Sequence, residues 1–226
     1  MSSEHREYYA AHVMDRVNQI QLAVIGIGIA ILAINYLGLV AIEFDVLQSE
    51  YYWQRLTLLL LVIVFASYTA LVYNAYPVQA RSSEGARSRV GYPLRVYSLF
   101  LLDIFQVTLA ACMFGVLFIP EAVQLLDSDN CIDDFTSEKC LGLPEYGIEI
   151  IFALGALWHL SVSAWYAIAD GFKVRDVPVH AIFAAVYVAM ALIHQVGWFG
   201  VWSAAAGFAL VLIALFVVQG RRWLGE

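Results

Sequence analysis

The stretch GIEIIFALGALWHLSVSAWYAIA, residues 147–169, contains Glu149 as its single Asp, Glu, Lys or Arg residue. A helix needs roughly 20 mainly apolar residues to cross a bilayer. Five further stretches have this length and character: 18–42, 54–76, 97–119, 178–197 and 200–219. The whole chain is 62% hydrophobic and 14% charged, whereas a soluble domain is about 25% charged. The sequence therefore predicts an all-α integral membrane protein, a six-transmembrane-helix bundle that forms a single domain over residues 1–226.

The basic residues predict how the bundle is oriented. Lys and Arg concentrate in cytoplasmic loops of membrane proteins. With the N- and C-termini cytoplasmic, ten of the 12 Lys and Arg residues fall on the cytoplasmic side, and only Arg55 and Lys139 fall outside. Most of the acidic residues then lie on the outer face. We therefore expect a protein of the cell or plasma membrane whose loop 120–146 is extracytoplasmic.

The loop 120–146 contains two of the three cysteines. Disulfides persist in extracytoplasmic compartments, and eight residues separate Cys131 from Cys140, so a bridge between them is sterically easy. Cys112 lies within an apolar stretch and is expected to be a small apolar filler. The sequence predicts a Cys131–Cys140 disulfide that closes a short acidic segment over the outer mouth of the bundle.

Polar residues inside the apolar stretches mark candidate functional positions, since ionisable groups are costly in a bilayer. Spacings of three and four residues place His159, Ser163 and Tyr166 on one face of the 147–169 helix. The next helix has a similar stripe that includes Tyr187, and the two stripes could face each other. Asp103 and Gln106 share a face of the 97–119 helix. We expect these six residues to form an ion or proton path.

The expected function is channel-like or transporter-like movement of a cation or proton through this path, which spans three to five would line. An acidic outer face raises the local concentration of cations, and Asp103 and His159 would be the groups that bind the ion or relay the proton. The alternative is a non-transporting membrane subunit or sensor that docks a cytoplasmic protein partner through its basic inner loops. The expected partners are the lipid bilayer and further copies of the chain in a homo-oligomer, and no nucleic acid.

An intramembrane haem or metal enzyme is the second alternative. Neutral imidazole binds haem iron, and His159, His180 and His194 lie in two adjacent apolar stretches. Counting depth from the helix ends places His180 and His194 near the two interfaces, each roughly 10 Å or more from the level of His159. No zinc-enzyme or glycine-loop motif is present, and both lysines lie in loops. The sequence therefore predicts no catalytic, cofactor-binding or metal-binding residues, and we expect no enzyme activity.

Overall fold

The computed structural model describes residues 3–80, 92–119, 136–170 and 176–223, and all of the regular structure in these ranges is helical. The long helices are α1 (Ser3–Ile31), α3 (Glu50–Ala80), α4 (Tyr92–Leu117), α7 (Gly147–Asp170), α8 (Asp176–Gln195) and α9 (Val201–Trp223). The short elements are the π-helix η1 (Leu32–Leu37), α2 (Gly38–Ile42), the 3-10 helix η2 (Phe44–Gln48) and α6 (Glu138–Leu141).

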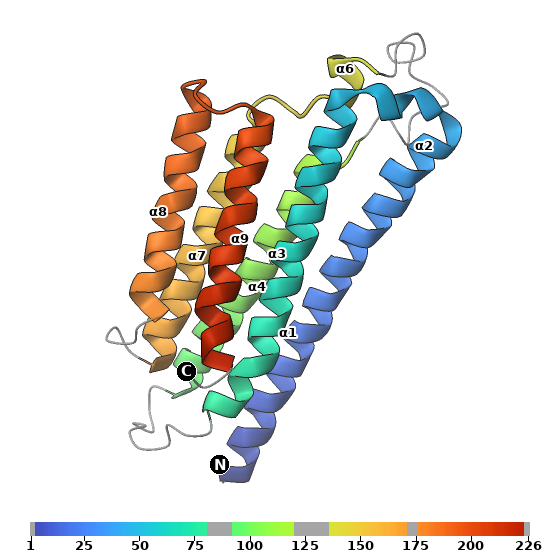
Figure 1. Ribbon diagram of the computed structural model, residues 1–226. Helices are drawn as coiled ribbons and strands as arrows, with labels where there is room; N and C mark the ends of the chain where they lie inside the picture. The colour runs from blue at the N-terminus through green and yellow to red at the C-terminus, as the bar shows by residue number, and fades with distance from the viewer. Residues whose placement is uncertain (1–2, 81–91, 120–135, 171–175, 224–226) are drawn as a thin grey trace.

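The six long helices run side by side in one bundle, with α1 beginning and α9 ending at the same end (Figure 1). We call this the terminal end, and the opposite end, which carries α6, the α6 end. Within the described ranges, six helical segments are long and apolar enough to cross a membrane: Val17–Ile42, Glu50–Ala70, Tyr97–Leu117, Gly147–Ile168, Asp176–Gln195 and Val201–Val218. The number and positions of the helices predicted from the sequence are therefore confirmed.

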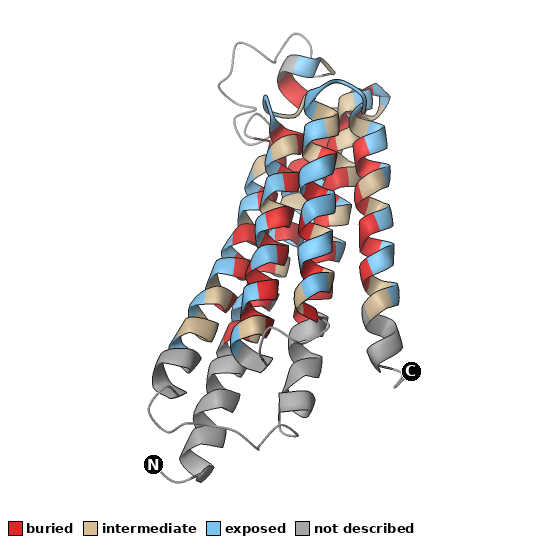
Figure 2. Cartoon of the chain, turned by 90° about the vertical axis from the view of Figure 1, so that its left-hand side faces the viewer, coloured by how far each residue is buried: buried red, intermediate tan, exposed pale blue. Residues whose placement is uncertain are grey.

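The helices of the bundle carry exposed residues on one side and buried residues on the side that faces their neighbours (Figure 2). Large apolar side chains are exposed along several helices, such as Ile34 at 66%, Ile182 at 63% and Leu210 at 66%. Many exposed apolar side chains of this size are unfavourable in water but not in hydrocarbon. The exposed apolar side chains and the lengths of the helices therefore both favour a bilayer around the bundle.

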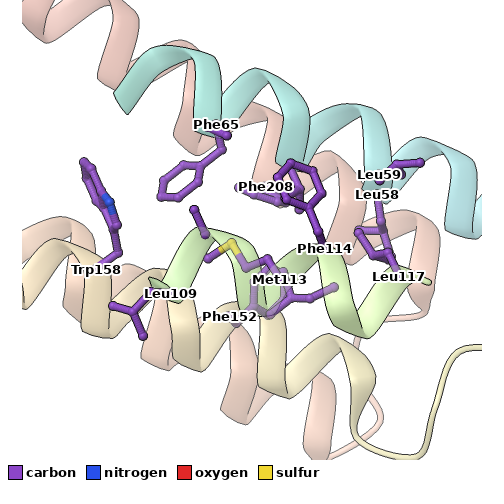
Figure 3. Packing of buried hydrophobic residues seen from close by; sticks show 14 of the residues in the cluster. Leu58, Leu59, Phe65, Leu109, Met113, Phe114, Leu117, Phe152, Trp158 and Phe208 are labelled. Carbon is purple, nitrogen blue, oxygen red and sulfur yellow. The ribbon is translucent and has the colours of Figure 1, made fainter. Parts of the chain in front are cut away.

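Aromatic side chains fill the centre of the bundle (Figure 3). Phe65 of α3 packs against Trp158 of α7 and Phe208 of α9, with ring centroids 5.0 and 6.2 Å apart. Phe114 and Met113 of α4 are likewise almost fully buried. Because the rings meet edge-on or tilted, they fill the space between four helices at favourable geometry. This packing holds α7 in the middle of the bundle, beside both α4 and α8.

The π-helix η1 interrupts the first apolar segment, which the sequence pattern did not predict. It places two consecutive residues, Asn35 and Tyr36, in the interior at 0% exposure. The Asn35 side chain donates to the Ile119 carbonyl oxygen at 3.3 Å and accepts from the Ile119 N–H at 3.4 Å. The Tyr36 hydroxyl donates to the Leu117 carbonyl oxygen at 2.7 Å. These contacts satisfy backbone groups at the end of α4, where helical partners are missing.

Side chains at the start of α3 and just before it hold α6 and the residues that precede it in place. Ser49 donates to the Thr136 carbonyl oxygen at 2.7 Å, and Tyr51 donates to a carboxylate oxygen of Glu138 at 3.3 Å. Cys140 is buried there, but Cys131 lies outside the described residues, so their disulfide stays a prediction. Cys112 is exposed on α4 rather than filling the core, contrary to expectation.

Candidate functional site

The polar stripes of α7 and α8 face each other along the interface between these two antiparallel helices. At the α6 end, His194 Nδ1 lies 2.8 Å from Glu149 Oε1. Nearer the terminal end, Ser163 donates a hydrogen bond to the Val177 carbonyl oxygen at 2.9 Å. A series of buried polar and aromatic side chains lies between these two contacts.

Two histidines meet in the middle of this interface. The Nδ1 atoms of His159 and His180 lie 2.9 Å apart, and both side chains have 0% exposure. Their rings are stacked, with centroids 5.2 Å apart and planes inclined by 29°. A neutral imidazole has one N–H donor and one acceptor nitrogen. This contact is a hydrogen bond when one ring carries its proton on Nδ1 and the other carries it on Nε2.

The contact corrects the predicted position of His180. From the sequence, His180 was expected near the cytoplasmic interface, roughly 10 Å from the level of His159. That estimate assumed that α7 ends and α8 begins at the same depth. The bond between Ser163 and Val177 shows instead that α8 begins level with Ser163, well before α7 ends at Asp170. The difference is about two helical turns, which brings His180 level with His159.

Aromatic rings enclose the histidine pair. Tyr166 stacks on His180 with centroids 5.8 Å apart, and Phe183 stacks on His159 at 5.4 Å. Trp158 meets His159 edge-on at 4.9 Å. The pair therefore lies in a dry, apolar setting, where an electrostatic or hydrogen-bonding interaction is stronger than it is in water.

Tyr187 lies next to the pair on the side towards the α6 end. Its ring centroid is 5.4 Å from that of His159. The Tyr187 hydroxyl and the His159 Nε2 atom are both buried without a hydrogen-bond partner among the described residues. A buried donor or acceptor without a partner costs free energy.

The remaining predicted path residues occupy other contacts. Ser163 uses its hydroxyl to bind the backbone of α8, which is a bundle-holding role. Asp103 is buried on α4, and its carboxyl group interacts with the Trp165 side chain of α7. Gln106 is buried one turn further along α4. The structure thus brings His159, Tyr166 and Tyr187 together and places Asp103 at the separate α4–α7 interface.

The geometry of the pair does not fit a haem. A metal–nitrogen bond of about 2 Å places two opposite imidazole ligands about 4 Å apart, with the macrocycle between them. The His159 and His180 nitrogens are 2.9 Å apart in direct contact, which leaves no room for a ring. Among the described residues, no group of three His, Cys, Asp or Glu side chains is arranged to hold a metal ion.

His180 is the site residue that the sequence did not identify. The spacing of His180, Ala184 and Tyr187 already placed it on the face of α8 that carries the polar stripe. Its depth was the missing information, because no local pattern says how far one helix slides along another.

Comparison with known proteins adds no relative. No protein-family model matches the sequence, no curated protein is similar to it, and no solved structure matches the fold.

Proposed function

We propose that this chain is an integral membrane protein of the cell membrane, with both termini cytoplasmic, that moves protons across the bilayer. The polar path runs along the α7–α8 interface. Support for the membrane location comes from the six apolar helices and the exposed apolar surface. Support for the orientation comes from the distribution of Lys and Arg in the sequence.

The observation that carries the proposal is the 2.9 Å contact between the Nδ1 atoms of His159 and His180. Imidazole can accept a proton on one nitrogen and release another from the second nitrogen. If His159 starts with its proton on Nδ1, a proton arriving at Nε2 makes it a cation. His159 then passes its Nδ1 proton to Nδ1 of His180, which releases its own Nε2 proton. One positive charge moves along the pair, and a further exchange of protons at the ring nitrogens, with water or a neighbouring hydroxyl group, restores the starting tautomers.

Two tyrosines extend the path from the histidine pair. Tyr187 lies beside His159 on the way to the α6 end, and Tyr166 stacks on His180. A phenol hydroxyl both donates and accepts a hydrogen bond, so it can pass a proton without becoming a lasting charge. Glu149 and His194 supply polar groups where the interface meets the α6 end.

The enclosure of the pair favours the proton over a metal or alkali cation. A dehydrated cation needs several oxygen or nitrogen ligands to replace its water shell. His159 is surrounded by the rings of Trp158, Phe183 and Tyr187. A proton needs no coordination shell, because it moves by exchange of hydrogen bonds.

Liposomes that contain the purified protein and an internal pH dye test this function. A potassium gradient with a potassium ionophore supplies the driving voltage. We expect the internal pH to change faster than in protein-free liposomes. At constant external K⁺, the rate should be the same whether the remaining external cation is Na⁺ or an impermeant organic cation. No protein-dependent pH change would overturn the proposal. Electrogenic Na⁺ or K⁺ uptake without a pH change would show that a cation, not a proton, is moved.

A further inference from the structure

Asp103 lies apart from the histidine pair, on the face of α4 that packs against α7. It is 4% exposed, and its Oδ1 atom is buried without a hydrogen-bond partner among the described residues. It is six residues into the Tyr97–Leu117 segment, which is about 9 Å from the end of that segment. The carboxyl group is therefore inside the apolar layer, at the half of the bundle nearer the terminal end.

The helices packed against α4 offer this carboxyl group no described counter-charge. They are α1, α3 and α7. The described side chains of α1, from Val17 onward, include no charged residue. The charged residues with described side chains on α3 and α7 are Glu50, Arg55 and Glu149, and all three lie near the α6 end. The other titratable residues with described side chains on these helices are Tyr51, Tyr52 and Tyr68 of α3 and His159 and Tyr166 of α7.

The contact that Asp103 does make is with a neutral donor. Trp165 of α7 is the side chain that interacts with it, and the neutral indole N–H can donate but cannot accept. The Oδ1 atom of the carboxyl group has no hydrogen-bond donor among the described residues. A neutral carboxylic acid fits this arrangement better than a carboxylate, which needs donors or cations at both oxygens.

The cost of an unpaired charge decides between the two forms. A buried ion that lacks a partner costs several kcal/mol, even after the protein relaxes, and such a group takes up a proton instead. We propose that Asp103 is a proton-binding site in its own right, which holds a proton at neutral pH at the α4–α7 interface. Release of that proton requires water or a cation to enter this interface, so proton loss is coupled to separation of α4 from α7. The site does not depend on proton movement through His159 and His180.

Infrared difference spectroscopy of the purified protein tests this site directly. The spectrum of Asp103→Asn is subtracted from that of the wild type at pH 7. We expect a carbonyl stretching band of a protonated carboxylic acid, shifted in D₂O, that the variant lacks. The matched control is Asp45→Asn, because Asp45 is exposed on η2 and accepts from Gln48. Its difference spectrum should show the two bands of a carboxylate.

Two outcomes would overturn the site. One is a carboxylate signature for Asp103 at pH 7 that does not depend on the cation present. The second is a carboxylate signature that changes when Na⁺ replaces K⁺, which would indicate that the site binds a metal cation. Trp165→Phe provides a second test if Asp103→Asn does not fold. Removal of the indole group that interacts with Asp103 should shift the carbonyl band, and an unshifted band would contradict its assignment to Asp103.

The same sample separates this inference from the proposed function. A protonated Asp103 band in a protein without proton flux supports the site and overturns proton movement. Proton flux in a protein whose Asp103 is ionised supports proton movement and overturns the Asp103 site. His180→Gln should retain the Asp103 band, because the two groups lie at different faces of α7.

Discussion

Gly155 of α7 lies directly against the ring of Tyr187 of α8. A Cβ atom at Gly155 would lie 2.8 Å from two carbon atoms of that ring. Such an approach is closer than packed carbon atoms tolerate, so the contact requires glycine. Close helix approach at small residues is common in membrane bundles. Here it sets the spacing at which the side chains of α7 and α8 meet.

Gly155→Ala should therefore destabilise the protein by about 1–3 kcal/mol, the usual cost of overpacking a core. Thermal unfolding in detergent measures this cost. Gly115→Ala is the matched control, since it adds the same methyl group to α4 at a position with no atom within 4 Å. Equal unfolding temperatures for the two variants would show that Tyr187 moves aside at no cost.

The contact between Asn35 and Ile119 gives a second prediction. Replacing Asn35 by the similarly sized leucine removes both hydrogen bonds to the Ile119 backbone. Since a buried backbone group without a partner costs about 1–3 kcal/mol, Asn35→Leu should lower the free energy of unfolding by that amount. Denaturant unfolding in mixed micelles provides the measurement.

Thr108→Val is the control for Asn35→Leu. Thr108 is exposed and binds only the Ile104 carbonyl oxygen of its own helix, at 2.8 Å, so its loss should change stability by less than about 0.5 kcal/mol. If Asn35→Leu left the free energy of unfolding unchanged, the end of α4 would not depend on its contact with the π-helix.

The cysteines test the predicted side of the acidic loop. The chain has three cysteines, and Cys112 is the free one among the described residues. With the loop in an oxidising compartment, alkylation of the unfolded, unreduced protein should modify only Cys112. Reduction before alkylation should raise the number of modified cysteines to all three. Intact mass spectrometry reads both values, and Cys112→Ala should give no modification before reduction. Full modification without reduction would contradict the disulfide and weaken the assigned orientation.

The six helices could be predicted from the sequence because length and apolar character alone determine which segments suit a bilayer. The residues 147–169 carried this signal, and the helix α7 begins at Gly147 and ends at Asp170. The π-helix could not be predicted, because LAINYL contains no glycine or proline to mark a break in the helix. The π-helix is stabilised by the hydrogen bonds that Asn35 and Tyr36 form with the backbone of Ile119 and Leu117, which are distant in the sequence.

The candidate site could be predicted only in part, for a similar reason. Periodicity showed which residues share a face of one helix, so the stripe of His159 and Tyr166 was visible in the sequence. The pairing of His159 with His180 depends on how far α8 slides along α7. Packing fixes that position through the Ser163–Val177 bond and the fit of Tyr187 against Gly155. Neither helix encodes this position by itself.

The histidine pair at 2.9 Å is the basis of the proposed proton movement, and glutamine provides the most direct test of it. Glutamine can donate and accept a hydrogen bond but does not take up and release protons at neutral pH. The liposome proton flux should be measured for the wild type, His159→Gln, His180→Gln and the double variant. His12→Gln, the same exchange ahead of the first apolar segment, is the control.

We expect each single variant of the pair to lower the proton flux at least tenfold, the double variant to be no slower than either single variant, and His12→Gln to match the wild type. Variants His159→Gln and His180→Gln that fold normally and conduct protons at the wild-type rate would contradict the proposed path.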